Sequence, residues 1–492
     1  MKLSKLCVGA GIDCPSGAEI NVTGFAIDNR KVAPGTVFGA FQGAQVNGED
    51  FIPAAIEAGA VAVVARAAAK VEGALHIASD IPRKCFAELA AGFFTPAPEH
   101  IVAVTGTNGK TSCVEMTRQI WRMSGERAAS IGTLGVTTPD ESVSTGLTTP
   151  DIVTFLSNMS GLAREGVTHV AYEASSHGLS QYRNEGVAVE AAGFTNFSRD
   201  HLDYHADMED YFAAKMRLFD EVVSDGATAV IWMGAGESGW NARVVDHAKQ
   251  RGLTVMTVGE QGEDIRLTHR EPTQLGQSLT VEHAGTERTI NLPLIGAYQV
   301  SNALVSGGLA LATGIDASRV WDAVARLQPV RGRLERAVIA PSGAPVYIDY
   351  AHTPDALEAA IAALRPHVTG RLITVFGAGG DRDHGKRAPM GEAAAKASDL
   401  VIVTDDNPRG EDPADIRRAV LEGAGEAREV AGRREAIHAA IAEAGKDDIV
   451  LIAGKGHETG QIIGSGENMR VHPFDDVEVA RECAALIARG DA

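Results

Sequence analysis

The sequence has few cysteines, a deficit of basic residues and no apolar run long enough to cross a membrane. Its five cysteines are scattered and lack the paired spacing of a metal site, which favours a reduced compartment. The N-terminus lacks the sustained apolar segment of a signal peptide, because Gly11 and Asp13 interrupt it. The apolar stretch at 60–69 carries Arg66 and is too short to span a bilayer. We therefore expect a cytoplasmic protein without membrane insertion.

The deficit of basic residues limits the kinds of molecule that the protein can be expected to bind. The chain has 45 Lys and Arg against 64 Asp and Glu, which gives a net charge of −19. A broad nucleic-acid surface needs an excess of basic residues, so we expect no nucleic-acid partner. A local basic pocket for a small anionic molecule is compatible with this balance. At roughly 150 residues per domain, the 492 residues are expected to form about three domains with a large apolar core.

What the chain does have is an alternation of short apolar strands and helices, which predicts an α/β fold. The segment 95–100 contains two prolines and is predicted to be a linker. We predict three α/β domains at 1–98, 99–330 and 331–492, with a doubly wound sheet in the second. The predicted strands are 35–41, 60–64, 101–105, 167–172, 227–232, 253–258, 346–348, 372–376, 400–404 and 449–453, with antiparallel strands at 265–293. The predicted helices include 51–58, 152–164, 208–222 and helices within 298–327.

A glycine-rich loop follows the predicted strand 101–105 and precedes an apolar helix. It reads Gly-Thr-Asn-Gly-Lys-Thr-Ser over residues 106–112. Glycines allow a tight turn that aims backbone N–H groups at phosphate oxygens, and the helix start adds partial positive charge. Lys110 is placed to reach the β- and γ-phosphates, and the Thr111 hydroxyl is a candidate Mg²⁺ ligand. Val104 stands where the general pattern has its first glycine, so the loop is a variant. The alternative is an ordinary glycine-rich turn.

Acidic and histidine side chains follow this loop in the second predicted domain. Glu173 ends a predicted strand, and ligands bind at this edge of open α/β sheets. An Asp- and His-rich stretch lies at 200–205, and Lys215 lies on the predicted helix 208–222. One carboxylate and one imidazole near a phosphate loop suit Mg²⁺ ions that bridge ATP and an acceptor carboxylate. The alternatives are polar loop residues or a helix cap at 200–205, and a lysine that extends from an amphipathic helix.

Three predicted strands of the third domain end in polar segments, at 377–387, 405–409 and 454–458. The side chains expected at this common edge are Arg382, Asp406, Asn407, Arg409 and Glu458. Arginine binds a carboxylate through two parallel hydrogen bonds, and Asp or Glu binds an ammonium, so the set suits an amino acid with additional charge. The alternative for 405–409 is a proline turn with a solvated arginine.

Taken together, these motifs resemble the Mur ligase family, whose phosphate loop also reads Gly-Thr-Asn-Gly-Lys-Thr. The resemblance covers nearly the whole chain, with several motifs in family order. It implies a three-domain architecture with a central P-loop ATPase domain on a parallel sheet and a C-terminal Rossmann-like domain. Family members join an amino acid to a carboxylate through an acyl phosphate. The implied cofactors are therefore ATP and two Mg²⁺ ions.

The resemblance also implies roles for individual residues. The nucleotide-binding residues would be Gly106, Thr107, Asn108, Gly109, Lys110, Thr111, Ser112, Asn302, Arg333 and Asp349. The metal ligands would be Thr111, Glu173, His201 and Lys215, the last as a carbamate formed with CO₂. The catalytic residues would be Lys110, Lys215, Arg333 and His352. Arg333 would neutralise phosphate charge, and His352 would move a proton or orient a neighbour. Gln299 stands where the family usually has Asn, which leaves its role open.

The substrate contacts implied by the resemblance lie in all three predicted domains. The run 406–409 resembles the amino-acid selector of the diaminopimelate-adding members, in which the arginine holds the distal carboxylate. The implied amino-acid contacts are Arg382, Asp406, Asn407, Pro408, Arg409, Gly454 and Glu458. The implied uridine-nucleotide contacts are Ile27, Asn29, Ala44, Gln45 and Val46, with Asn29 in place of the usual Ser. The implied muramoyl-dipeptide contacts are Thr148, Thr149, Ser175, Gln181 and Arg183.

The reaction implied by the resemblance is the ATP-dependent addition of meso-diaminopimelate to the D-Glu side-chain carboxylate of UDP-N-acetylmuramoyl-L-Ala-D-Glu, in peptidoglycan synthesis, by a monomeric enzyme. The nearer alternatives are a lysine-adding Mur ligase and a folylpolyglutamate synthase-like ligase, and the run 406–409 argues against both. From a different class, the alternatives are a phosphate-loop kinase and a nucleotide-binding regulatory module. A kinase would leave a stable phosphorylated product, and a regulatory module would bind ATP without turnover.

Overall fold

The computed structural model describes residues 1–43, 46–138, 140–143, 148–202, 204–235, 239–273 and 276–490. Its contacts divide the chain into two compact units, and each is described by itself. Unit 1 comprises 1–267, 282–286 and 301–324, and unit 2 comprises 268–281, 287–300 and 325–492. The two boundaries expected from the sequence, near 98 and 330, stay predictions. In the described residues, no helix has the length and apolar character needed to cross a membrane.

Unit 1 begins with a four-stranded sheet of order β1-β2-β3-β4, in which all neighbours are parallel. Its inner strands are short apolar runs, and Val37, Phe38, Val63 and Val64 are buried in it. Such runs suit strands that are covered on both faces. The strands are β1 (Gly24–Ala26), β2 (Thr36–Gly39), β3 (Ala60–Ala65) and β4 (Leu75–Ala78), and the helices are α1 (Leu3–Ala10), α2 (Ile52–Glu57) and α3 (Pro82–Phe93).

The larger sheet of unit 1 has the order β12-β11-β10-β5-β9-β6-β7-β8. The strands from β12 to β6 are parallel, and β7 and β8 continue the edge in antiparallel pairing. The predicted parallel sheet is thus confirmed. The strands are β5 (His100–Thr105), β6 (Ala128–Gly132), β7 (Gly135–Thr137), β8 (Ser142–Val143), β9 (His169–Glu173), β10 (Val189–Phe194), β11 (Val223–Trp232) and β12 (Thr254–Gly259).

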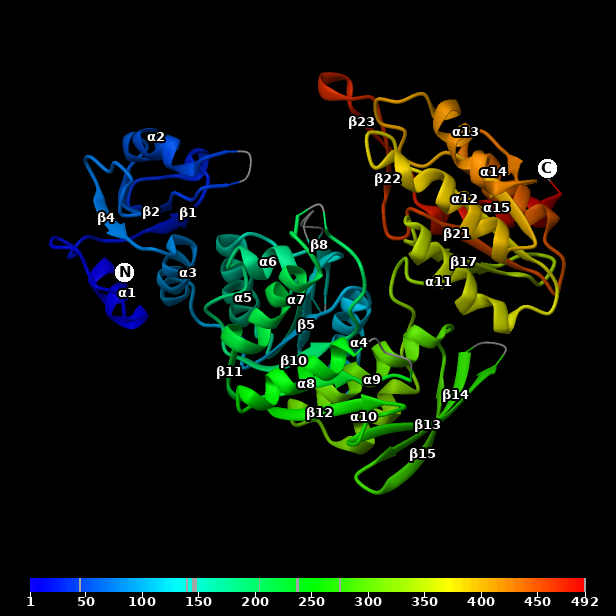
Figure 1. Cartoon of the computed structure of the whole chain (residues 1–492), viewed down its shortest axis with the longest axis horizontal. Coiled ribbons are helices and arrows are strands. Elements are labelled where there is room, and N and C mark those ends of the chain that lie inside the picture. The colour runs from blue at the N-terminus through cyan, green and yellow to red at the C-terminus, as the bar shows by residue number, and fades with distance from the viewer. Residues whose placement is uncertain are drawn as a thin grey trace. The chain divides into compact units, whose positions relative to one another are not determined.

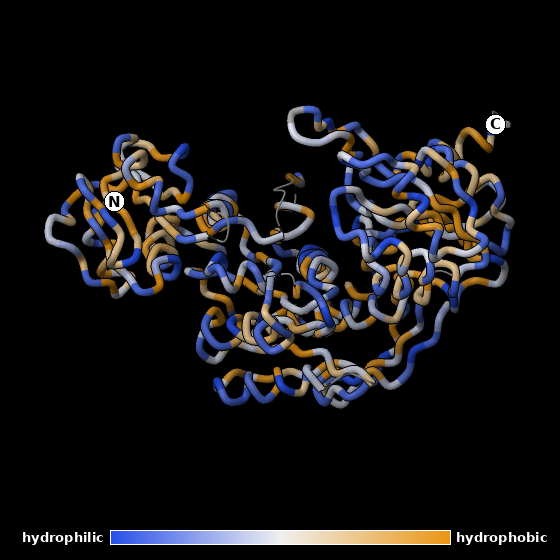
Figure 2. Tube along the Cα trace, turned by 45° about the horizontal axis from the view of Figure 1, so that its top comes forward, coloured by the Kyte–Doolittle hydropathy of each residue, from blue (hydrophilic) through white to orange (hydrophobic). Residues whose placement is uncertain are grey.

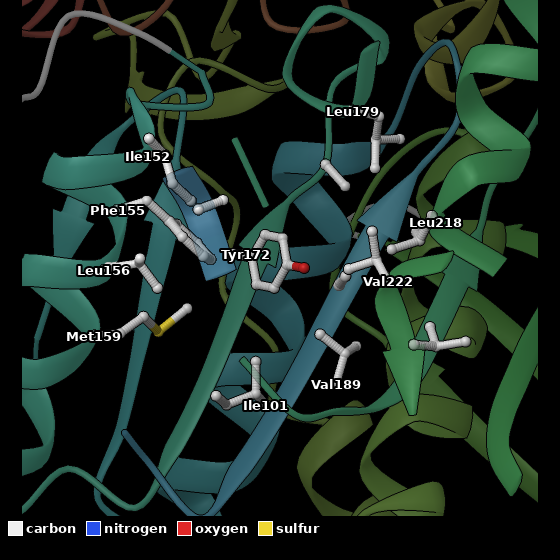
Figure 3. Close-up of a cluster of buried hydrophobic side chains, with 14 of the residues drawn as sticks. Ile101, Ile152, Phe155, Leu156, Met159, Tyr172, Leu179, Val189, Leu218 and Val222 are labelled. Carbon is white, nitrogen blue, oxygen red and sulfur yellow. The ribbon is translucent and has the colours of Figure 1, made fainter. Parts of the chain in front are cut away.

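An apolar core lies between this sheet and helix α5 (Ile152–Arg164), as Figure 3 shows. Phe155 and Met159 lie on the buried side of the helix, four residues apart, and the Phe155 ring meets the Tyr172 ring at 5.0 Å between centroids. Asp151 caps the helix by accepting hydrogen bonds from the N–H groups of Val153 and Thr154. The predicted helix 152–164 is confirmed at both ends.

The remaining helices of unit 1 include those that follow strand ends of the larger sheet. They are α4 (Lys110–Met123), α6 (Ser176–Ser180), α7 (Met208–Arg217), α8 (Trp240–Gln250), α9 (Ala297–Ala312, from Ser301 onward in unit 1) and α10 (Ala317–Val324). Helix α7 continues into a π-helical turn at Leu218–Val222, so the predicted helix 208–222 is one continuous helical segment.

Unit 2 contains a sheet of order β16-β17-β21-β18-β19-β20, in which only β16 is antiparallel to its neighbour. Alternate residues of one strand enter different cores. Tyr347 packs with α11, α12 and α13, whereas Val346 and Ile348 pack with α14 and α15. Both faces of the sheet are therefore covered by helices (Figure 1), and its strands are strongly apolar (Figure 2). This arrangement matches the predicted Rossmann-like sheet.

The elements of unit 2 agree with the predicted strands to within one residue at most ends. They are β16 (Glu335–Ile339), β17 (Pro345–Asp349), β18 (Leu372–Phe376), β19 (Leu400–Val403), β20 (Arg428–Glu429), β21 (Ile449–Ala453), α11 (Pro354–Leu364), α12 (Arg387–Ala397), α13 (Pro413–Ala424), α14 (Arg433–Glu443) and α15 (Asp476–Arg489). A hairpin of β22 (Gly460–Ile463) and β23 (Arg470–Pro473) follows β21. Strands β13 (Ile265–Thr273), β14 (Gly276–His283) and β15 (Thr286–Leu292) form the predicted β-structure at 265–293.

Candidate active site

The glycine-rich loop joins β5 to α4 in unit 1. Gly106 has φ +140° and Gly109 has φ +86°, values that residues with a side chain rarely adopt. A Cβ atom at Gly106 would lie 2.0 Å from the Thr195 hydroxyl oxygen, and one at Gly109 would lie 2.3 Å from Oδ1 of Asn302. Both glycines are therefore needed for backbone conformation and for space. This geometry is what a phosphate-binding loop requires.

Gly106→Ala is expected to raise the KM for ATP by about tenfold or more, because the loop must shift to accommodate both the new Cβ and an unfavourable φ. Gly161→Ala is the control, since that glycine lies within helix α5 and its Cβ would meet no atom within 4 Å. Steady-state kinetics with varied ATP measure the effect. An unchanged KM for ATP in Gly106→Ala would show that this loop does not hold the nucleotide.

Two lysine side chains meet at the loop backbone. Lys110 Nζ donates to the carbonyl oxygens of Gly106 at 2.9 Å and Thr107 at 2.8 Å. Lys215 Nζ donates to the same Gly106 oxygen at 2.7 Å, and Lys215 is only 1% exposed. Burial, reinforced by the charge of Lys110, holds the pKa of Lys215 well below its usual range. This environment favours the uncharged form of the Lys215 amine.

Thr195 and Asn196 have no role that the sequence alone predicts, and they hold the loop from the end of the neighbouring strand. Thr195 donates to the Asn108 carbonyl at 2.6 Å, and Oδ1 of Asn196 accepts from the Asn108 N–H at 2.9 Å. Both residues follow β10, which is the neighbour of β5 in the sheet. Their place after an apolar strand was a signal that sequence reasoning could have used.

The candidate metal ligands lie near the carboxyl ends of β5 and β9. Glu173 is 2% exposed and accepts from the Thr133 N–H at 2.7 Å, and it stands opposite Val104 in the β5–β9 register. His201 is half-exposed and its ring lies 5.0 Å from the His177 ring. Among the side chains that the structure describes, no three of the His, Cys, Asp and Glu type lie close enough to form a metal site. The hydroxyl of Thr111 and the carboxylate of Glu173 nevertheless supply the oxygen atoms that suit Mg²⁺.

The residues predicted to contact the dipeptide form one hydrogen-bonded group in unit 1. Thr149 Oγ1 lies 2.9 Å from Ser175 Oγ and donates to the Glu173 carbonyl at 3.0 Å. Arg183 donates to the Thr149 carbonyl at 3.0 Å and to Oε1 of Gln181 at 2.6 Å. The group is completed by Thr148, whose hydroxyl lies 3.1 Å from that of Thr133. Hydrogen bonds thus connect all five predicted residues, and Thr148 joins the others through Thr133 and Glu173.

The predicted uridine contacts lie at the first sheet of unit 1. Ile27 follows β1, and Asn29 begins a 3₁₀ turn at Asn29–Lys31 that Asp28 caps through the Arg30 N–H. Val46 is 58% exposed, and its carbonyl accepts from the Gly43 N–H at 2.9 Å. Ala44 and Gln45 lie outside the described residues. The role of this group stays a prediction.

In unit 2, Asp349 ends β17 and is held by backbone groups. Its two oxygens accept from the N–H groups of Leu334 and Ala351, each at 2.8 Å. Burial raises the pKa of Asp349, and the nearby Arg333 opposes that rise. The Arg333 guanidinium lies 4.8 Å from the centre of the Tyr350 ring. Gln299 donates to the Arg333 carbonyl at 3.1 Å, which gives this unusual glutamine a structural contact.

His352 follows Asp349 in the same loop and is exposed. Its Nδ1 lies 2.9 Å from the Tyr350 carbonyl oxygen, which can only accept, so Nδ1 carries a proton. Its ring lies 4.6 Å from the Tyr350 ring. The Tyr350 loop therefore holds both Arg333 and His352.

The predicted amino-acid contacts gather where β18, β19 and β21 end. Arg409 adopts φ +50° and donates from Nη1 to the Gly380 carbonyl at 3.0 Å. A Cβ at Gly379 would lie 2.9 Å from that Nη1 and 3.9 Å from Cγ of Arg382, so the two arginines face the same glycine. A Cβ at Gly454 would lie 2.7 Å from Oδ2 of Asp406. Close backbone approach at these glycines brings the three strand ends together.

A network of hydrogen bonds links the same strand ends. Asn407 Nδ2 donates to Oε2 of Glu458 at 2.9 Å, and Lys455 Nζ donates to that oxygen at 3.1 Å. Arg433 Nη1 lies 3.8 Å from Oδ2 of Asp406, and Arg433 Nη2 forms an ion pair with Oδ2 of Asp476 at 2.6 Å. The sequence alone assigns no role to Lys455 or Arg433, because a lone cation in an apolar or glycine-rich segment does not reveal its partner.

Arg433→Met is expected to destabilise unit 2 by about 3–5 kcal/mol, because Asp476 then stays buried without its charged partner. Both side chains of the pair are 0% exposed. Arg434→Met is the matched control, since Arg434 is 46% exposed and its ion pair with Glu482 should be worth about 0.2–1 kcal/mol. Urea denaturation of both variants measures the difference. Equal small shifts in the two midpoints would contradict the assigned role of the buried pair.

Comparison with known families gives three matches along the chain. Residues 21–93 match the model "Mur ligase family, catalytic domain", residues 104–310 match "Mur ligase middle domain", and residues 332–456 match "Mur ligase, glutamate ligase domain". A relative from Zymomonas mobilis is 59% identical over 98% of both chains. One from Bradyrhizobium diazoefficiens is 51% identical over 99% of this chain and 100% of its own. Both are named UDP-N-acetylmuramoyl-L-alanyl-D-glutamate–2,6-diaminopimelate ligase.

Solved structures of similar fold agree with these matches. A structure titled UDP-N-acetylmuramoyl-L-alanyl-D-glutamate–2,6-diaminopimelate ligase is 32% identical, with a TM-score of 0.74 over 99% of both chains. A folylpolyglutamate synthase from Mycobacterium tuberculosis, complexed with ADP, is 21% identical, with a TM-score of 0.62 over 76% of this chain and 91% of its own. The second likeness concerns the fold alone.

Proposed function

Because this chain belongs to the Mur ligase family, we propose that it joins meso-diaminopimelate to the D-Glu side-chain carboxylate of UDP-N-acetylmuramoyl-L-alanyl-D-glutamate at the expense of ATP. The observation that supports the proposal is that one chain contains both a phosphate-binding loop and a site suited to an amino acid. Unit 1 holds a phosphate loop beside the group around Thr149 and Arg183, and unit 2 holds Arg409 and Glu458 at a sheet edge. The names of the relatives support this choice over lysine or glutamate as the added amino acid.

The proposed reaction has two steps. An oxygen of the substrate carboxylate attacks the γ-phosphorus of ATP, which forms the acyl phosphate and releases ADP. The unprotonated amine of diaminopimelate then attacks the acyl carbon, and phosphate leaves with the former carboxylate oxygen and the amine loses a proton. Two anions must meet in the first step, so neutralisation and positioning are the main tasks of the protein.

The residues of this chain divide these tasks. The Lys110 ammonium neutralises charge that develops on the transferred phosphoryl group, and the loop N–H groups orient it. Arg333, placed beside Tyr350, would neutralise phosphate charge from unit 2. Thr111 and Glu173 would hold Mg²⁺, with His201 and Lys215 as the further predicted ligands, and the ion would supply charge neutralisation for the phosphates. We also propose a cytoplasmic monomer with domain boundaries near 98 and 330.

The experiment that tests the proposal is phosphate release from ATP. Phosphate should appear only when the UDP-muramoyl-dipeptide and an amino acid are both present, and kcat/KM should be much higher for diaminopimelate than for lysine or glutamate. A stable phosphorylated product without the amino acid would indicate a kinase. Binding of ATP without any turnover would indicate a regulatory module. Preference for lysine would contradict the proposed amino acid.

The buried amine of Lys215 leads to a separate prediction. A neutral amine can attack CO₂ to give a carbamate and a proton, and the environment of Lys215 favours the neutral form. Protein equilibrated with ¹³C-labelled CO₂ should therefore show a carbamate carbon resonance. Lys215→Arg should abolish the signal, whereas Lys249→Arg, at an exposed lysine, should retain it. A signal that persists in Lys215→Arg would place the modification elsewhere.

A further inference from the structure

Lys455 is a buried cation without a role in the proposed reaction. It is 0% exposed and lies in the turn after β21, between Gly454 and Gly456. Its ammonium donates to Oδ1 of Asn407 at 2.9 Å and to Oε2 of Glu458 at 3.1 Å. Burial of an ammonium is costly unless it is paired and hydrogen-bonded, so any movement that breaks these two hydrogen bonds is unfavourable. Lys455 therefore holds Asn407 and Glu458 in place.

The first consequence concerns the side-chain amide of Asn407. Its Oδ1 meets two donors, the Lys455 ammonium and the Ile462 N–H, each at 2.9 Å. The reversed amide would place an NH₂ group against both donors, so only one orientation is satisfied. Nδ2 then faces Oε2 of Glu458 at 2.9 Å. Lys455 and the Ile462 N–H together determine that Asn407 offers its Nδ2 to Glu458.

The second consequence concerns the carboxylate of Glu458. Oε2 accepts from both Asn407 and Lys455. Within the part of the chain that the structure describes, Oε1 makes no hydrogen bond, and the Glu458 side chain is 33% exposed. One oxygen is therefore held by the protein, and the other is left as an acceptor at the edge that carries Arg409 and Asp406.

We propose that Lys455 is a positioning residue, which orients Asn407 and Glu458 so that Oε1 of Glu458 binds the ammonium group of the incoming amino acid that does not react. This inference rests on the proposed function, in which the added amino acid carries two amines. The amine that attacks must lose its proton, whereas the other amine stays charged. A carboxylate suits that second group. Lys455 acts through Glu458 and does not contact the substrate.

The test compares diaminopimelate with 2-aminopimelate, which lacks the second amine. In the wild-type enzyme, kcat/KM should favour diaminopimelate by about tenfold to a hundredfold, the range for a hydrogen bond between charged groups. Lys455→Met should reduce this preference about tenfold or more, chiefly through the KM for diaminopimelate, and leave the KM for ATP within about twofold. Lys446→Met, at an exposed lysine ahead of β21, should keep the wild-type preference.

A loss of activity that is equal for the two amino acids would overturn the proposal, because a merely structural role lowers both alike. If Lys455→Met does not fold, the double variant Lys455→Met/Glu458→Gln removes both charges and leaves none buried and unpaired. Its preference should equal that of Glu458→Gln alone, and a further loss of preference would show that Lys455 acts independently. Wild-type turnover of diaminopimelate supports the proposed function whatever the variants do, so the two ideas fail separately.

Discussion

Lys110→Ala is expected to lower kcat by about a hundredfold to a thousandfold, the range for loss of one group that stabilises developing charge. The Lys110 ammonium lies at the start of α4 and is held by two carbonyl oxygens of the loop itself. It is therefore already ordered at the place where phosphate is expected. Its removal leaves the transferred phosphoryl group without that cation. The thermal midpoint should change little, because Lys110 is only half-buried.

The measurement is phosphate release at saturating concentrations of all three substrates. Lys249→Ala is the control, since it removes an exposed cation from α8 of the same unit. A second effect is expected at Lys215, whose pKa is lowered in part by the charge of Lys110. Removing Lys110 should therefore raise the pKa of Lys215. A fall in kcat of less than about fivefold would show that this lysine is not the phosphate-binding group.

Arg409→Ala is expected to raise the KM for diaminopimelate by about a hundredfold, because the distal carboxylate loses its charged partner. Loss of such a partner costs about 2–5 kcal/mol of binding free energy. The backbone of Arg409 is fixed on both sides. Its N–H donates to the Ile462 carbonyl at 3.0 Å, and its carbonyl accepts from the Gly464 N–H at 2.7 Å. The hairpin of β22 and β23 thus holds the unusual backbone conformation from which the side chain extends.

Kinetics with diaminopimelate and lysine separate this role from a general loss of activity. Lysine has no distal carboxylate, so Arg409→Ala should affect it much less. Arg409→Lys should fall between Ala and the wild type, because an ammonium keeps the charge and loses the two-pronged geometry. Arg418→Ala removes an exposed arginine of α13 and should leave both KM values unchanged. Equal increases for the two amino acids would refute selection by Arg409.

The elements that could be predicted from the sequence are those whose pattern is local. The helix 152–164 has an Asp cap and an apolar side, and the strands 372–376 and 449–453 are short apolar runs, so all three are confirmed at both ends. The prediction of a strand at 35–41 was too long, because strand pairing ends at Gly39 and the chain turns into the loop that follows. Helix ends and strand ends depend on such tertiary contacts.

The candidate site shows the same division. The phosphate loop and the run 406–409 are contiguous motifs, and they could be found by reading along the chain. The contacts of Thr195 with Asn108, and of Lys455 with Asn407, join segments far apart in sequence. Which of these residues are buried, and which partners they meet, depends on the order of the strands in each sheet, and that order cannot be read along the chain. The contact between Gln299 and Arg333 is of this kind, and so its role could not be predicted from the departure at one position.

In the proposed reaction, the substrate carboxylate is activated as an acyl phosphate. The most direct measurement uses UDP-muramoyl-dipeptide whose D-Glu side-chain carboxylate carries ¹⁸O in both oxygens. Attack of that carboxylate on ATP, followed by displacement by the amine, must transfer one labelled oxygen to phosphate and leave the other in the amide. Mass spectrometry of the released phosphate should therefore find one ¹⁸O atom for each amide formed. Amide formation with unlabelled phosphate would contradict the mechanism.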